Sequence, residues 1–305
     1  MPNLTPYSRI DTDAPEPSDA VSLEIRRLLE NSAIELSTNG ESTIRRAAKC
    51  LTPGTTVFVP KMPKQSLEAK LEQIRILNDV GLNPVPHIVA RQLTSEKALV
   101  DFLAQAAAVG GVRQVLVVGG DGFDPAGPFK DAAAVIASGI LTNAGIRKVG
   151  VGGYPDGHPE IAAEHLRADL ENKAMLAREQ GLALNVVTQF SFAPDRIADY
   201  CSDLQKWIPG IPVYAGLAGP TSPAQMLRFA RICGVSMSVR GASKLGLNAF
   251  KLAANSGPDT QVAVLADRGA AQMTGNLQGI HLFSFGGFVE SSEWLSEKRY
   301  ASGLS

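Results

Sequence analysis

Eight short β-rich runs recur along the chain from residue 33 onward, and each is followed by a loop and a longer helix-like segment. Strands that alternate with helices pair in parallel through crossover connections. Eight such units in about 270 residues predict a single-domain (β/α)8 TIM barrel, which is an α/β fold. The eight runs are AIELS (33–37), TVFVP (56–60), VPHIV (85–89), QVLVVG (114–119), KVGVGG (148–153), LNVVTQF (184–190), PVYAGL (212–217) and IHLFSF (280–285).

The main alternative is an open doubly wound sheet, which usually carries GxGxxG after its first strand. The chain has no such motif there, and VVGGDGF (117–123) has the wrong spacing. We expect a proline-rich N-terminal arm over residues 1–30 and one barrel domain over residues 31–305. RGASKLGLNAFKLAANSG (240–257) predicts an extra helix before the last strand.

One intervening segment, SEKALVDFLAQAAAVGG (95–111), has apolar residues at helical spacing. Ser95 is placed to cap its N-terminus, and Gly110 and Gly111 are placed to end it.

Composition excludes several classes of partner. Lysine plus arginine nearly balances aspartate plus glutamate, 29 against 30, so we expect neither a nucleic acid nor a membrane partner. The three cysteines form no CxxC or zinc spacing, which predicts reduced thiols in a cytoplasmic protein. We find no signal-peptide pattern at the N-terminus and no apolar run long enough to span a bilayer.

Several chemistries have no motif in this chain. It contains no GxSxG elbow, no GxxxxGK[ST] phosphate loop and no HExxH pair. A metal site is therefore not expected. The remaining carboxylates, aromatic rings, amides and glycine-lined openings suit a planar organic ligand.

Polar groups gather at or just after the predicted strand ends, where a barrel of this kind carries its reacting residues. They come from six different strands, and this convergence is stronger evidence than any single residue. The groups are Glu35, His87, Asp121, the pair Tyr154 and His158, Gln189, and His281.

Each of these groups also has a structural interpretation. Glu35 could be an interior carboxylate paired with a lysine, and Asp121 could cap a helix or hold its turn. His87 and His281 are the type of strand histidine that more often belongs to a core. Gln189 must bond to something when buried, either a ligand or protein.

Together, the motifs from residue 33 to about 295 resemble the methylenetetrahydrofolate reductase family. The resemblance implies a TIM barrel that binds FAD at the strand ends. Its activity would pass a hydride from NADH or NADPH through FAD to 5,10-methylenetetrahydrofolate, giving 5-methyltetrahydrofolate, in one-carbon metabolism and methionine biosynthesis. The motifs are IELSTNG, NPVPHIVAR, VLVVGGD, GYPDGHPE, VVTQFSF, PVYAGLAGPTSPAQMLRFARICGV and GIHLFSFGG.

The resemblance also implies roles for individual residues. Glu35 matches the acid that protonates the folate nitrogen as its five-membered ring opens. Asp121 matches the catalytic aspartate beside flavin and folate, which would orient the pterin and tune the flavin electrostatically. Gln189 matches the glutamine that meets the pterin and, in the other half-reaction, the nicotinamide. Cofactor contacts are implied for His87, Gly119, Gly120, Asp121, Tyr154 and His158, with Asp169, Asn172 and Lys173 as candidates on the helix after the fifth strand.

The chain departs from the family pattern where a flavin contact and two arginines are usual. Pro60 and Lys61 follow the second strand, Gly119 precedes Gly120 after the fourth, and Gly287 stands in the loop after the eighth. Two alternatives therefore stay open: direct hydride transfer from the nicotinamide without flavin, and a tetrahydrofolate-binding barrel of a methyltransferase system. The reaction could also run in the oxidative direction, and we expect a homo-oligomer.

Overall fold

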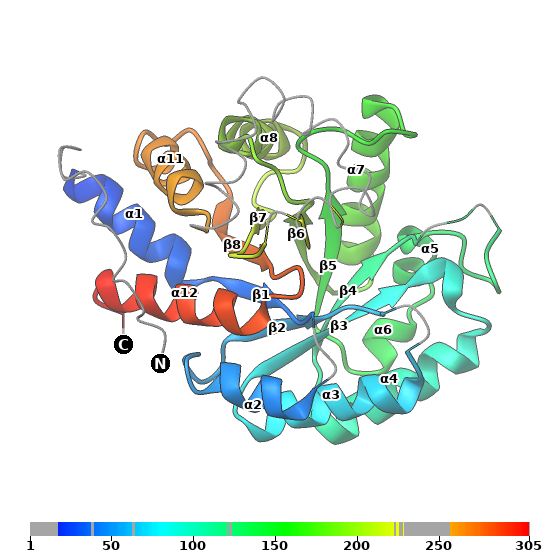
Figure 1. Ribbon diagram of the computed structural model, residues 1–305. Helices are drawn as coiled ribbons and strands as arrows, with labels where there is room; N and C mark the ends of the chain where they lie inside the picture. Colours follow the sequence, from blue (N-terminus) through cyan, green and yellow to red (C-terminus); the bar gives the residue numbers. More distant parts are fainter. Residues whose placement is uncertain are drawn as a thin grey trace.

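The computed structural model describes residues 18–37, 40–62, 65–120, 122, 124–222, 224–225, 228 and 257–304. Eight parallel strands close into a barrel in the order in which they occur along the chain (Figure 1). The predicted fold class is confirmed, and every predicted strand is present. The strands are β1 (Ala33–Glu35), β2 (Thr56–Val59), β3 (Asn83–Val89), β4 (Gln114–Val118), β5 (Lys148–Gly153), β6 (Ala183–Thr188), β7 (Val213–Ala218) and β8 (Leu277–Phe283).

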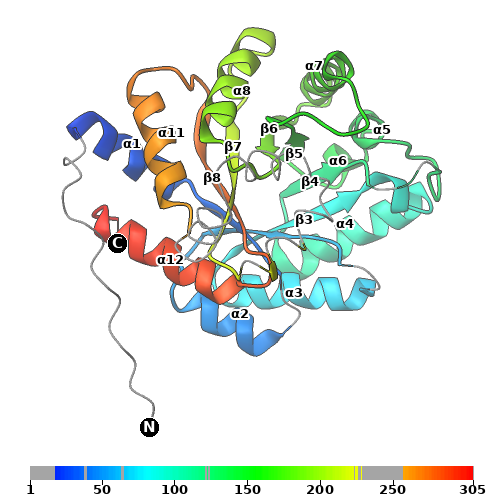
Figure 2. The ribbon, with the colours of Figure 1, turned by 45° about the horizontal axis from the view of Figure 1, so that its top comes forward.

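Helices surround the strands (Figure 2). They follow the strands along the chain as the crossover rule requires. Those described are α1 (Asp19–Glu30), α2 (Glu41–Ala48), α3 (Leu67–Asp79), η1 (Ala90–Gln92), α4 (Glu96–Gly110), α5 (Ala132–Ala137), α6 (Ile140–Asn143), α7 (Ala163–Glu179), α8 (Pro194–Trp207), α11 (Asp259–Ala270) and α12 (Phe288–Ala301).

The ends of α4 follow the local sequence signals. The Ser95 hydroxyl accepts a hydrogen bond from the backbone N–H of Ala98 at 3.1 Å, which confirms it as the N-cap. Gly111 closes the other end with a φ of 58°, a conformation that favours glycine.

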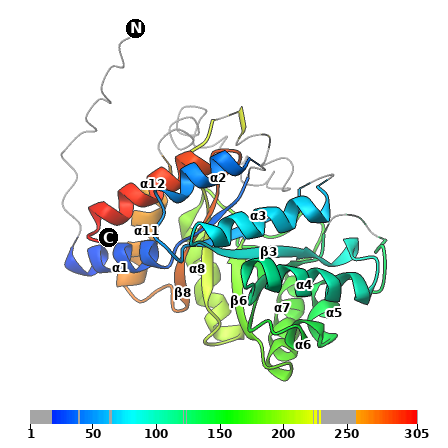
Figure 3. The same cartoon turned by 90° about the horizontal axis from the view of Figure 1, so that it is seen from below.

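The predicted N-terminal arm is described from Ser18 onward, and there it forms α1. This helix lies beside α11 and α12 (Figure 3), so residues 18–30 pack on the barrel. The predicted extra helix, residues 240–257, lies outside the described residues except for Gly257. α11 is the described helix that precedes β8.

Alternation along the strands separates two apolar layers. Val57 and Val59 on β2 belong to the large cluster between strands and helices, whereas Phe58 between them faces the barrel interior. The interior layer is small and lies across the middle of the barrel, so polar side chains are left for its two ends. Its buried members are Ala33, Phe58, Val85, Leu116 and Val187.

Gly216 on β7 provides a test of this packing. A Cβ there would collide with the backbone oxygen of Thr188 and lie 2.8 Å from the ring of Phe283. We expect Gly216→Ala to lower the free energy of unfolding by roughly 1–3 kcal/mol, because overpacking forces its neighbours apart. Gly119→Ala is the control, since nothing lies within 4 Å of a Cβ at that position. Urea unfolding that gave equal stability for both variants would contradict this account.

Candidate active site

Glu35 lies at the carboxyl end of β1 between two histidines. Its Oε2 is 3.8 Å from Nε2 of His87 on β3 and 3.8 Å from Nε2 of His281 on β8. Strand register accounts for the meeting, because β8 pairs with β1 and β2 joins β1 to β3. The first and last strands of the barrel thus contribute to one cluster.

These three side chains are nearly closed off from solvent, with exposed fractions of 18% for Glu35, 12% for His87 and 1% for His281. Nε2 of His87 and both ring nitrogens of His281 have no hydrogen-bond partner in the described part of the chain. Buried polar atoms are normally bonded. A separation of 3.8 Å is too long for a direct hydrogen bond but allows a bridging water or closure around a ligand.

Aromatic rings hold the two imidazoles in place. The edge of Phe58 meets His281 at a centroid distance of 4.6 Å and His87 at 6.0 Å. Phe283 meets His281 at 4.7 Å, also nearly perpendicular. Packing on both sides fixes the ring of His281, although its nitrogens make no hydrogen bond to the described residues.

A buried lysine supports β3 from the helical layer. Nζ of Lys70 on α3 donates to the backbone oxygen of His87 at 2.6 Å and lies 5.2 Å from the centroid of the Phe102 ring. Burial, followed by the charge of Lys61, lowers the pKa of Lys70 to about 7. Burial, followed by the charges of Lys70 and His281, holds the pKa of His87 well below its ordinary value. His87 is therefore neutral at neutral pH.

Gln189, a predicted site residue, follows β6. Its side-chain Oε1 accepts the backbone N–H of Phe190 at 3.1 Å. Because a backbone N–H can only donate, the oxygen must face Phe190, and the side-chain NH2 is left to donate elsewhere. In the described structure no contact joins Gln189 to Glu35, and β7 and β8 separate their strands. Phe190 itself is buried among Phe192, Phe283 and Phe285.

The loop between β5 and α7 brings Tyr154 and His158 together. Their rings meet edge to face at 5.2 Å. The turn closes through the backbone N–H of Gly157, which donates to the backbone oxygen of Tyr154 at 3.0 Å. Nδ1 of His158 accepts the backbone N–H of Glu160 at 3.2 Å. The two predicted contacts thus form one unit, and their role toward FAD stays a prediction.

A groove of about 440 Å³ lies between this loop, α7 and α8. Tyr154 and Asp169 both line it. Asp169 forms an ion pair with Lys173 one turn along α7. Asn172 is exposed and does not line the groove. Of the three residues predicted on this helix, Asp169 therefore lines the groove. Lys173 does not line it but is paired with Asp169.

The α8 side of the groove is aromatic. The Arg167 guanidinium lies over the Trp207 ring, 5.1 Å from its centroid, and Tyr200 meets the same indole at 6.4 Å. Burial raises the pKa of Tyr200, so its hydroxyl stays protonated. Arg196 on α8 reaches Asp156 in the loop at 3.7 Å. These rings and cations suit a flat, polar ligand.

Gly119 and Gly120 directly follow β4, and an arginine from η1 lies against them. Arg91 in η1 donates through Nη1 to the Gly120 oxygen at 2.8 Å and through its backbone N–H to the Gly119 oxygen at 3.0 Å. Gly120 has a φ of 90°, and a Cβ there would collide with Val89. Asp121, predicted as catalytic, lies outside the described residues.

Sequence reasoning left three members of this site without a role. The sequence leaves His281 open to interpretation as a core histidine and indicates no role for Lys70 or Phe58. An inward position two residues before Phe283 on β8 is the signal that could have identified His281. No comparable signal marks Lys70, whose contact depends on how α3 packs.

The described residues contain no group of three histidine, cysteine, aspartate or glutamate side chains arranged to hold a metal ion. None of the described helices is long and apolar enough to cross a bilayer.

The lowered pKa of Lys70 makes a prediction about stability. In the unfolded chain Lys70 has its ordinary pKa of 10.5, so above about pH 7 the unfolded state keeps a proton that the folded state releases. The free energy of unfolding should therefore rise with pH, by at most about 1.4 kcal/mol per unit between pH 7 and 8.5.

Lys70→Met should lose this slope, because no buried amine then titrates. The window stays below 9.0, the ordinary pKa of Cys201, whose raised value acts in the opposite direction at higher pH. Urea unfolding of both proteins at the two ends of the window measures the difference. Equal slopes would show that Lys70 is not the titrating group.

Comparison with known proteins agrees with the barrel fold. A solved structure of an uncharacterised protein from Clostridium thermocellum, which binds two copies of 5-methyl-5,6,7,8-tetrahydrofolic acid, is similar with a TM-score of 0.54 and 11% identity. The match covers 88% of this chain and 95% of that one and supports the barrel fold. The family model for methylenetetrahydrofolate reductase matches residues 57–266, which is more than half of the chain. The protein belongs to the methylenetetrahydrofolate reductase family.

Proposed function

We propose that the protein interconverts 5,10-methylenetetrahydrofolate and 5-methyltetrahydrofolate with NADH or NADPH, using FAD. The observation that carries this proposal is the buried carboxyl of Glu35 at the strand ends, flanked by two imidazoles with unbonded nitrogens. Family membership makes a folate the expected substrate, and the similar structure that binds methyltetrahydrofolate supports the same class.

Glu35 is the proposed general acid. Its proton would pass to the folate nitrogen as the carbon–nitrogen bond of the five-membered ring breaks and the electron pair returns to that nitrogen. Positioned acids of this kind contribute about 10²–10⁴-fold to a rate. Because His87 is neutral, it adds no positive charge that would favour the ionised carboxylate over the protonated acid.

Gln189 is proposed to orient the pterin. Its side-chain NH2 is free to donate because its oxygen is held by the Phe190 N–H. Pterin rings carry carbonyl and ring-nitrogen acceptors that such a donor can bond. Because β7 and β8 lie between β6 and β1, a substrate that reached both residues would span that part of the barrel mouth.

The groove beside α7 fits the flat base of a dinucleotide, since it is hollow and has an aromatic wall. Tyr154 and Asp169 line this groove and would hold FAD there, with His158 packed against Tyr154 and with Gly119 and Gly120 allowing close approach at β4. FAD, when bound, would supply the hydride carrier between the nicotinamide and the folate. Asp121, His87 and Lys173 keep their implied contacts as part of this proposal.

The second candidate is the same reaction by direct hydride transfer from the nicotinamide. Lys61 is exposed after β2, where the family places a flavin contact. At Gly287 a Cβ would lie 2.7 Å from the Pro220 oxygen, so the loop after β8 has no room for the family's folate-binding arginine. These features favour weaker binding of flavin and pterin. They also keep open a tetrahydrofolate-binding barrel of a methyltransferase system.

Glu35→Gln tests the role of the acid. We expect folate reduction to fall by roughly 10²-fold or more, because the amide cannot supply the proton. Reduction of bound flavin by NADH should change little. Anaerobic half-reactions of the purified protein, started from its visible spectrum, measure both steps. Glu41→Gln on the exposed face of α2 is the matched control.

The outcomes of this experiment separate the candidates. Colourless protein that reduces methylenetetrahydrofolate would establish the direct route, and Glu35→Gln should still abolish it. Protein that binds methyltetrahydrofolate without turnover, with or without added FAD, would favour the methyltransferase-type barrel. Survival of both half-reactions in the variant would rule out Glu35 as the acid.

His281 is proposed as a positioning residue for Glu35. His281→Asn removes the second imidazole near the carboxyl, and we expect about a tenfold fall in kcat for folate reduction and a displaced acid limb in the pH profile. A purely structural role would lower stability without moving that limb. His165→Asn on the exposed face of α7 is the control.

A further inference from the structure

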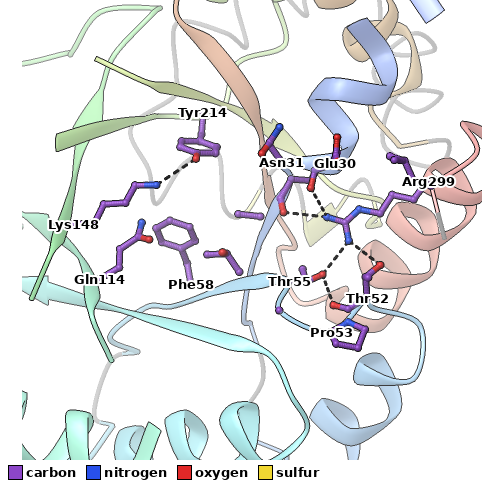
Figure 4. A pocket seen from close by; sticks show the side chains of 15 residues that line it. Glu30, Asn31, Thr52, Pro53, Thr55, Phe58, Gln114, Lys148, Tyr214 and Arg299 are labelled. Atoms are coloured by element: carbon purple, nitrogen blue, oxygen red, sulfur yellow. Dashed lines mark hydrogen bonds between the residues drawn. The ribbon is translucent and has the colours of Figure 1, made fainter. Parts of the chain in front are cut away.

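A second cavity opens at the amino end of the barrel, away from the carboxyl ends of the strands. Figure 4 shows side chains that line this cavity. Its volume is about 360 Å³, within the range of small-ligand sites. It is lined by the beginnings of β1, β2, β4, β5 and β7 and by Arg299 of α12. Nothing in the proposed reaction uses this end of the barrel.

The charges around the cavity are unbalanced. Lys148 and Arg299 line it, whereas Glu30 is its only acidic lining residue. Glu30 is exposed. No carboxylate in the described part of the chain forms an ion pair with Lys148 or Arg299. The cavity therefore carries an excess of positive charge, which favours an anion.

Arg299 supplies charge but no spare hydrogen-bond donor. Its guanidinium is buried and bonded throughout, and burial lowers its pKa. These bonds tie α12 to the chain entering β1 and β2, so its place at the cavity is fixed. Its partners are the backbone oxygens of Leu29, Glu30 and Ser32 and the hydroxyls of Thr52 and Thr55.

Lys148 and Gln114 supply the free donors. They are neighbours in the β4–β5 register, and both line the cavity. Nζ of Lys148 donates only a long bond, 3.4 Å, to the hydroxyl of Tyr214 on β7. An ammonium group has three donors, so two remain for a ligand. The side-chain amide of Gln114 has no hydrogen-bond partner in the described structure.

The far wall of the cavity is apolar and aromatic. Phe58 lines it from the side opposite His87 and His281, and its ring belongs to the middle layer that closes the barrel. Tyr214 adds a second ring. Figure 4 shows Lys148, Gln114, Phe58 and Tyr214 around one space. A ligand with a flat apolar body and one anionic group matches this arrangement.

We propose that this cavity binds a small aromatic carboxylate, held through its carboxylate by Lys148, Gln114 and the Tyr214 hydroxyl, with its ring beside Phe58. The alternative is that the residues around this cavity contribute only to stability, as the amino-end face of a TIM barrel usually does. An interior filled for stability alone would need no lysine without a carboxylate partner facing an open space.

Benzoate is the probe, and benzamide is its uncharged counterpart. We expect benzoate, followed as 4-fluorobenzoate by ¹⁹F NMR and by calorimetry, to bind the intact protein and benzamide not to bind. Lys148→Met should lower the affinity for benzoate by about tenfold or more, because it removes the charge-assisted hydrogen bond. Lys148→Arg should retain most of the affinity. Lys206→Met, an exposed lysine on α8, is the control.

Tyr214→Phe provides a second variant in case Lys148→Met does not fold. It should lower the affinity for benzoate several-fold. A folate carries a benzoyl group of its own, so excess methyltetrahydrofolate is added to the benzoate complex. Benzoate that stays bound when the folate is added supports the amino-end site. Displacement by the folate together with unchanged binding to Lys148→Met would place benzoate at the strand ends and overturn the proposal. Equal binding of benzoate and benzamide, or none at millimolar concentration, would overturn it as well.

Discussion

Closure of the eight-stranded sheet forces every second side chain of each strand into one shared interior. That space is filled across its middle by Phe58, Leu116 and Val187. Beyond this layer, polar inward side chains line the two ends of the barrel. Glu35 and its histidines collect at the carboxyl end, and Lys148 with Gln114 at the amino end. Both candidate sites are consequences of the same packing constraint.

The electrostatics of the site at the carboxyl ends of the strands depend on burial more than on ion pairs. Glu35 has imidazoles beside it, but the one on β3 is neutral because burial and nearby positive charges lower its pKa. Lys70 lies behind the strand and bonds to a backbone oxygen, so its charge acts on His87 without neutralising the carboxyl. In the described part of the chain, Glu35 is thus enclosed beside two imidazoles without an ion pair to a lysine or arginine.

The strands could be predicted because their apolar runs and the helices between them carry a strong periodic signal. The carboxyl-end location of Glu35, His87, Tyr154 and Gln189 followed from strand order alone. What could not be predicted depends on register and on helix packing. The closeness of Glu35 and His281 needs the last strand to pair with the first, and the contact of Lys70 needs α3 seated on β3.

Comparing motifs position by position also overstates what the chain has lost. Gly119 replaces an arginine usual in the family, which by itself predicts a missing positive charge after β4. The structure has Arg91 bonded to that same turn from η1, held by the oxygens of Gly120 and Lys130. A cation is thus present beside the β4 loop, contributed by the neighbouring connection. A barrel can restore a charge from a different strand end because all of these ends meet at one rim, so a missing motif residue does not by itself remove the function.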